Sequence, residues 1–120
     1  MNNTKTSVIN VKTYSFAIRI VRLVQFLQKE KNEYVLSKQI LRSGTAIGAL
    51  VRESEFGQSK ADFVHKLSIA LKEANETAFW LSLLKDTDYI DERLAKSLLD
   101  DCNEIIPILI SSIKTAKKNQ

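Results

Sequence analysis

Acidic side chains and one histidine are the residues of this chain whose types and spacing could hold a metal ion. Glu53, Glu73 and Glu76 are candidate carboxylate ligands. The segment Asp62-x-x-His65 is the closest match to the Glu-x-x-His motif, which di-iron helix bundles use twice. Because His65 is the only histidine, a second motif cannot form, and we expect neither a bound metal nor metal-dependent catalysis.

Cys102 and a pair of glycines are the other residues with possible chemistry. Cys102 lies on the apolar seam of a predicted helix, where cysteine usually acts as a small buried hydrophobe. A cysteine nucleophile needs a neighbouring base and a polar cleft, and the sequence indicates neither. Gly44-x-x-x-Gly48 lies within a predicted helix and lacks the Gly-Lys-Ser/Thr ending of a phosphate-binding loop. We therefore expect no catalytic residue, no cofactor and no small-molecule substrate.

Arginines and glutamates flank a run of small residues at 43–49, and two interpretations of them remain open. In the first, this group, together with two glutamates of the next helix, forms charge pairs between the second and third helices, which set packing specificity more than stability: Arg42, Arg52, Glu53, Glu73 and Glu76. In the second, the arginines belong to a basic face that binds nucleic acid, which needs clustered cations but no pocket. The predicted members of that face are Arg19, Arg22, Lys38, Arg42, Arg52 and Lys60.

Helical periodicity places these residues on four segments. The first helix is predicted from Val11, with an apolar stripe formed by Phe16, Ile20, Leu23, Val24 and Leu27, and it fades in the polar run 28–33, where Asn32 can end it. The second starts near Tyr34 or Val35. Gly44 and Gly48 lie four residues apart within it, which predicts a close approach of a neighbouring helix, with a ligand or second subunit as the alternative.

Two further helices follow a glycine stop and an aspartate cap. Gly57 suits the residue after a helix end, and Ser59 with Asp62 is a start signal for a helix from Lys60 to about Asp86. Asp91 is a predicted N-cap for the fourth helix, whose apolar pattern continues through Pro107.

Composition agrees with one helical domain. The chain has 120 residues, 44% of them hydrophobic, with only three glycines and one proline to supply turns. The net charge is +4, and residues 1–60 hold ten Lys or Arg against four Asp or Glu, which could favour a polyanion. No run of about 18 apolar residues and no signal-peptide pattern is present, so we expect a cytoplasmic protein without membrane association.

The segments "LSKQILRSGTAIGALVRE" and "SKADFVHKLSIALKEANETAFWLSLL" carry a resemblance to a known family. They are similar to the bacterial four-helix-bundle proteins encoded within intervening sequences of 23S rRNA genes, also labelled S23 ribosomal proteins. The likeness runs from about Phe16 to Ile113. Where relatives commonly read S-I-G-A-N-Y-R-E, this chain has A-I-G-A-L-V-R-E at 46–53, so Leu50 replaces a polar asparagine.

The resemblance implies a bundle that assembles as a ring, a homopentamer, without enzymatic activity. A related accessory protein of diversity-generating retroelements has a basic surface thought to engage nucleic acid and a reverse transcriptase. We therefore expect an all-α, antiparallel up-down-up-down four-helix bundle spanning residues 1–120, with frayed ends at 1–10 and 115–120. Two functions remain open: a self-associating scaffold that binds RNA or DNA, or an interaction ring without nucleic-acid affinity. The predicted subunit contacts are Phe56, Phe79 and Trp80.

Overall fold

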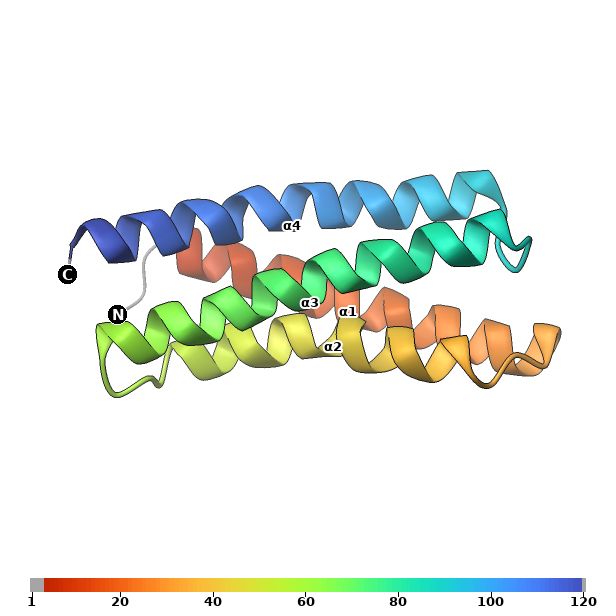
Figure 1. Cartoon of the computed structure of the whole chain (residues 1–120), viewed down its shortest axis with the longest axis horizontal. Coiled ribbons are helices and arrows are strands. Elements are labelled where there is room, and N and C mark those ends of the chain that lie inside the picture. The colour runs from red at the N-terminus through yellow and green to blue at the C-terminus, as the bar shows by residue number, and fades with distance from the viewer. Residues whose placement is uncertain (1–3, 120) are drawn as a thin grey trace.

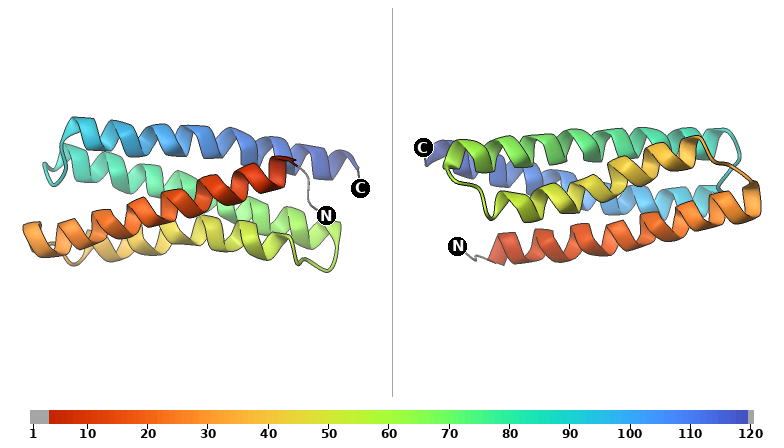
Figure 2. Two further views of the ribbon diagram at one scale, coloured as in Figure 1. Left: turned by 180° about the vertical axis from the view of Figure 1, so that it is seen from behind. Right: turned by 90° about the horizontal axis from the view of Figure 1, so that it is seen from below.

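The computed structural model describes residues 4–119, which form four helices joined by short turns (Figure 1). These helices are α1 (Thr4–Lys31), α2 (Leu36–Ser54), α3 (Lys60–Asp86) and α4 (Glu92–Lys118). Consecutive helices run antiparallel, and α4 returns to contact α1, so that each helix touches two others and lies diagonal to the third (Figure 2). The rod measures 47 × 21 × 19 Å. The predicted all-α antiparallel bundle is confirmed.

The first and last helices extend further than the sequence pattern indicated. Helix α1 begins at Thr4 rather than Val11, and Ile9 is buried in the core. Helix α4 continues to Lys118. Residues 4–10 and 115–118 are helical, and Ile9 and Ile113, near the two helix ends, are buried in the core. Positions 1–3 and 120, also predicted to fray, lie outside the described residues.

A buried carboxylate begins α2. The side chain of Glu33 accepts hydrogen bonds from the backbone N–H groups of Val35, Leu36 and Ser37, at 3.1, 2.9 and 2.7 Å. The preceding Asn32 adopts a positive φ of 52° and ends α1, as predicted. Three free N–H groups at a helix start would otherwise lack partners. Glu33 therefore sets the start of α2 at Leu36, just after the predicted Tyr34 or Val35.

The other two helix starts follow their sequence signals. Ser59 and Asp91 accept hydrogen bonds from the N–H groups three residues on, at 3.0 and 2.8 Å, and both predicted caps are confirmed. Gly57 behaves differently from its predicted role. Its φ is not positive, and its N–H donates to the carbonyl of Ser54 at 3.2 Å. The turn after α2 thus ends the helix without a left-handed residue.

The glycines of α2 allow α1 to approach closely. A Cβ added at Gly44 would lie 2.8 Å from Ile20 Cγ1, and one added at Gly48 would lie 3.3 Å from the Thr13 carbonyl oxygen. Ile20 and Thr13 are both buried. The predicted role of the two glycines in close helix packing is confirmed, and the neighbour is α1 of the same chain.

We predict that Gly44→Ala lowers the free energy of unfolding by about 1 kcal/mol, whereas Gly48→Ala leaves it unchanged or raises it. Overpacking a filled core costs roughly 1–3 kcal/mol. Replacing glycine by alanine inside a helix stabilises the helix by about 1 kcal/mol. Only at Gly44 does the new methyl overlap a fully buried side chain. Urea unfolding of the two variants compares them directly, and a Gly44→Ala protein more stable than wild type would contradict the packing explanation.

We predict that Glu33→Gln destabilises the bundle by about 1–2 kcal/mol at neutral pH, because hydrogen bonds to charged groups contribute roughly 1.5–3 kcal/mol. Burial disfavours the charged form, but the backbone N–H donors outweigh it and hold the pKa of Glu33 below its ordinary value. A lowered pKa contributes stability above the ordinary glutamate pKa, and this contribution is lost as pH falls through the folded-state pKa. The stability difference between wild type and variant should therefore shrink in acid, and a difference independent of pH would exclude this role.

Candidate functional site

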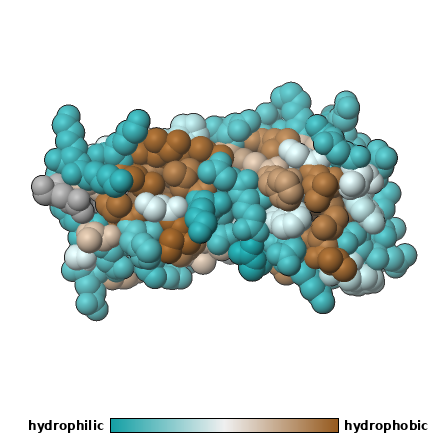
Figure 3. Space-filling view, in the orientation of Figure 1, coloured by the Kyte–Doolittle hydropathy of each residue, from teal (hydrophilic) through white to brown (hydrophobic). Residues whose placement is uncertain are grey.

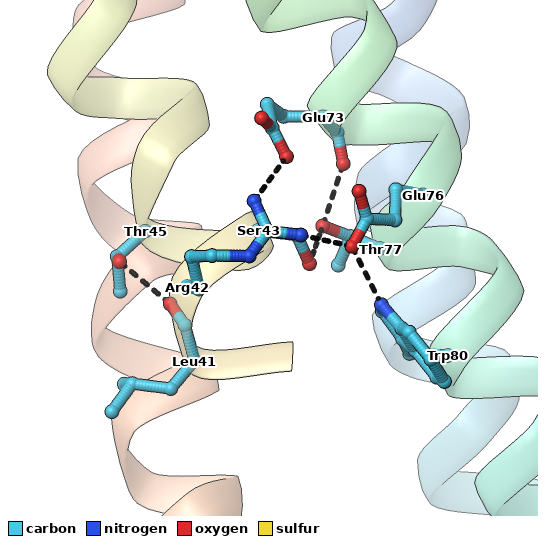
Figure 4. A network of polar contacts seen from close by, with 8 residues as sticks. All are labelled: Leu41, Arg42, Ser43, Thr45, Glu73, Glu76, Thr77 and Trp80. Atoms are coloured by element: carbon cyan, nitrogen blue, oxygen red, sulfur yellow. Dashed lines mark hydrogen bonds and ion pairs between the residues drawn. The ribbon is translucent and has the colours of Figure 1, made fainter. Parts of the chain in front are cut away.

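A polar network joins α2 to α3 around Arg42 (Figure 4). Its guanidinium donates to Glu73 Oε1 at 3.1 Å and also to Glu76. The indole Nε1 of Trp80 donates to the same Glu76 oxygen at 2.9 Å. The predicted charge pairing between these two helices is confirmed for Arg42. Because the Arg42 side chain is half exposed, the pairs contribute at most about 1 kcal/mol to stability.

Two buried hydroxyls lie beneath this network. The oxygens of Ser43 and Thr77 are 2.9 Å apart, at hydrogen-bond distance, and both residues are fully buried. Thr77 also donates to the backbone carbonyl of Glu73 at 2.8 Å. The pair thus bridges α2 and α3 inside the core, where a hydroxyl without a partner is costly.

Of the other two members of the predicted charge group, Glu53 also pairs with α3, as predicted, whereas Arg52 does not. Glu53 accepts a hydrogen bond from Lys66 of α3 at 3.2 Å. Arg52 lies over the ring of Tyr14 in α1, 5.9 Å from its centroid. The group predicted as one cluster is therefore divided among three contacts along α2.

Three of the six cations predicted to bind nucleic acid are engaged within the protein. Arg19 donates to Asp101 at 2.7 Å, at the edge between α1 and α4. Arg42 is held by its two carboxylates at the opposite edge, between α2 and α3. Lys60 donates to the backbone carbonyl of Asn119 at 2.8 Å. A phosphate would have to compete with these partners, and the three cations do not share a face.

The remaining three cations lie on the side of the bundle formed by α1 and α2. Arg22 donates to Gln25 at 3.2 Å, and Arg52 lies over Tyr14. Within residues 4–119, Lys38 makes no hydrogen bond or ion pair. No carboxylate neutralises any of the three in that part of the chain, so this side keeps positive charge available to a partner.

An apolar stripe on the outer face of α1 was missed by the sequence analysis. It consists of Val11, Tyr14, Ile18 and Val21, which are 67, 59, 47 and 38% exposed. The sequence signal was present, since these residues recur three, four and three positions apart on the face opposite the core stripe. The stripe was missed because Arg19 and Arg22 directly follow two of its residues and made this face look polar. We call these four residues the α1 stripe.

The predicted subunit contacts do not form one surface. Phe79 is 59% exposed on the outer face of α3 and packs edge-to-face on Trp80, with ring centroids 5.1 Å apart. Trp80 is itself partly buried against the core. Phe56 is 78% exposed in the turn before α3. It lies near the start of α3, and Phe79 is about 28 Å further along that helix at 1.5 Å per residue.

The structure places the potential nucleophile out of reach of solvent. Cys102 is fully buried in α4, and burial, with a smaller contribution from the charge of Asp101, raises the pKa of its thiol to about 12. The thiol is therefore protonated and unreactive at neutral pH. His65 is exposed on α3. Across residues 4–119, no three side chains of the ligating types gather closely enough to hold a metal ion.

A shallow groove runs between α1 and α4, and its charges are already paired. It is lined by Val11, Ser15, Phe16 and Ile105 together with Lys12, Asp101 and Glu104. Lys12 forms an ion pair with Glu104 at 2.6 Å, and Asp101 forms an ion pair with Arg19. The groove thus offers no free cation to an anionic ligand. None of the helices described at 4–118 is long and apolar enough to cross a membrane.

Comparisons with known proteins agree with this geometry. The family described as "23S rRNA-intervening sequence protein" matches residues 5–111. A crystal structure of a protein with unknown function from the S23 ribosomal protein family of Bacteroides thetaiotaomicron is similar, with a TM-score of 0.91 and 55% sequence identity over 92% of this chain and 99% of that one. No curated protein sequence matches the chain.

We predict that Thr77→Val lowers the free energy of unfolding by about 1–2 kcal/mol, because the buried hydroxyl of Ser43 loses its partner. The double variant Ser43→Ala/Thr77→Val removes both hydroxyls and should cost less than the sum of the single changes. A double-mutant cycle in urea measures this coupling. Strict additivity would show that the two hydroxyls do not depend on each other.

Proposed function

The chain belongs to the 23S rRNA-intervening sequence protein family, and we propose that it is a non-enzymatic scaffold that self-associates through apolar surfaces on the outside of its bundle. The observation that carries this proposal is the exposure of large apolar side chains on two diagonal helices, the α1 stripe and Phe79 on α3. Exposed apolar residues scattered singly need no explanation, whereas contiguous ones mark contact surfaces. A second copy would cover them.

The absence of enzymatic activity is supported by the residues that could have carried it. No activity is established for the family. The thiol of Cys102 is buried and protonated, and the carboxylates Glu73 and Glu76 are engaged with Arg42. For the assembly we propose a homopentameric ring, the size that the family resemblance implies.

A second candidate function is RNA binding on the side formed by α1 and α2. It is favoured by Arg22, Lys38 and Arg52, which have no carboxylate partner among the described residues. The number of these cations sets the expected salt dependence of RNA binding. With three phosphate contacts, the association constant should fall with roughly the 2.7th power of the salt concentration. Such binding is weak near physiological salt and becomes measurable at low salt.

Light scattering after size exclusion, at low and high salt and with and without a structured RNA, tests both functions. We expect an oligomer at both salt concentrations, because burial of apolar surface does not depend on screening. Phe79→Ala should shift mass toward the monomer, since it removes an exposed ring without disturbing the core. Trp80→Ala is less informative, because Trp80 also supports the Arg42 network. We expect RNA to join the peak at low salt only.

A triple variant, Arg22→Ala/Lys38→Ala/Arg52→Ala, should lose RNA uptake while keeping the oligomer. The matched control removes three exposed cations from the other two helices, Lys72→Ala/Lys96→Ala/Lys114→Ala, and should bind RNA like wild type. A wild-type protein that stays monomeric at all concentrations would refute the scaffold. Equal RNA uptake by both triple variants would refute the assigned RNA-binding surface. If wild type took up no RNA at low salt, RNA binding would be refuted and the interaction ring without nucleic-acid affinity would be the remaining function.

A further inference from the structure

We propose that the turn between α1 and α2 binds unpaired nucleotides of RNA, with bases stacked on exposed aromatic rings and phosphates held by lysines. This inference rests on the second candidate function, RNA binding on the side formed by α1 and α2. It goes further by naming the kind of RNA and the place where the bases would lie. We call residues 26–38 the turn site.

The turn site exposes large apolar side chains that lie outside the core. Tyr34 and Val35, between the two helices, are 51 and 71% exposed, and Phe26, near the end of α1, is 39% exposed. None of the three belongs to the buried cluster or to the side chains packed against it. Aromatic rings held at the surface are platforms on which the bases of a single strand stack, and such stacking tolerates any sequence.

Lysines surround these rings, and their charges are available. Lys29 and Lys38 are exposed and make no hydrogen bond or ion pair within residues 4–119. Lys31 lies over the ring of Phe26, 5.9 Å from its centroid. The carboxylate of Glu33 is buried and accepts hydrogen bonds from the start of α2, so it does not neutralise the lysines. Cations for phosphates beside rings for bases are the components of a site for single-stranded nucleic acid.

The backbone of the turn site is held on both sides of Tyr34. Before this residue, the N–H of Glu33 donates to the carbonyl of Leu27 at 3.0 Å. After it, the hydroxyl of Ser37 donates to the carbonyl of Glu33 at 2.9 Å, beside the bonds that the Glu33 carboxylate accepts. A site that is ordered in advance loses less conformational entropy when its ligand binds. The ring of Tyr34 is thus presented by a fixed turn.

The distribution of charge at this end of the rod sets the direction of a bound strand. The α3–α4 turn lies at the same end and carries four exposed carboxylates, at positions 86, 88, 91 and 92. Figure 3 shows hydrophobic side chains at the lower right, where α2 begins, and mainly hydrophilic ones at the upper right, where α3 and α4 meet. Carboxylates repel phosphates, so the strand would leave the turn site past Lys38, toward Arg22 and Arg52.

Fluorescence anisotropy at low salt, with a short labelled RNA strand alone or annealed to its complement, tests the turn site. The bases of a duplex are stacked on one another, so wild type should bind the single strand more tightly. Tyr34→Ala should weaken binding of the single strand by about tenfold and leave binding of the duplex unchanged, whereas Tyr34→Phe keeps the ring and should bind like wild type.

The matched control is Phe56→Ala, which removes an exposed ring from the turn at the other end of the bundle. Phe56 is 78% exposed and lines a shallow hollow together with Glu53 and Asp62, where carboxylates disfavour phosphate. This variant should bind the single strand like wild type. A strand that contains 5-iodouridine couples to stacked aromatic rings on irradiation, and mass spectrometry should locate the product at Tyr34 or Phe26.

Equal binding of strand and duplex by wild type would overturn the turn site. Unchanged binding by Tyr34→Ala, or a photoproduct confined to other parts of the chain, would do the same. Each of these results leaves RNA binding on the side of α1 and α2 standing, because the triple variant tests it separately. If wild type bound neither RNA at low salt, the RNA-binding function itself would be refuted.

Discussion

The close approach of α1 to α2 at Gly44 is the contact on which the rest of the structure depends. With no side chain at Gly44, Ile20 reaches the backbone of α2 and is fully buried there. That contact sets the rotation of α1 about its own axis. At 3.6 residues per turn, side chains two positions apart in the sequence are rotated by about 200° around the helix axis and therefore point to nearly opposite sides. Once Ile20 faces α2 and the core, Ile18 must therefore face solvent, and the α1 stripe follows from the packing of the core.

The same packing decides what the charged residues can do. Arg42 lies on the flank of α2 that turns toward α3, where Glu73 and Glu76 meet it. Arg52 lies on the opposite flank and meets the ring of Tyr14 instead. Arg19 and Arg42 are thus held by carboxylates between neighbouring helices. Arg22, Lys38 and Arg52 have no carboxylate partner among the described residues, and this difference separates the paired cations from the candidates for binding.

The molecule is a rod of 47 × 21 × 19 Å with large apolar side chains exposed on the outer sides of α1 and α3. Among the described residues, its core holds the buried thiol of Cys102 and the hydroxyl pair of Ser43 and Thr77, which bridges α2 and α3.

The sequence by itself determined the features that depend on neighbouring residues. Helical periodicity predicted four helices and their order, and the caps at Ser59 and Asp91 follow from local hydrogen bonds within one turn. The tertiary structure alone decided the partners of distant residues, such as Arg19 and Asp101, which are 82 positions apart. The stripe predicted from Phe16 to Leu27 is the buried one, as helical spacing indicated. The tertiary structure showed in addition that a second set of apolar residues on α1, the α1 stripe, stays exposed, because α2 and α4 pack on the other side of that helix.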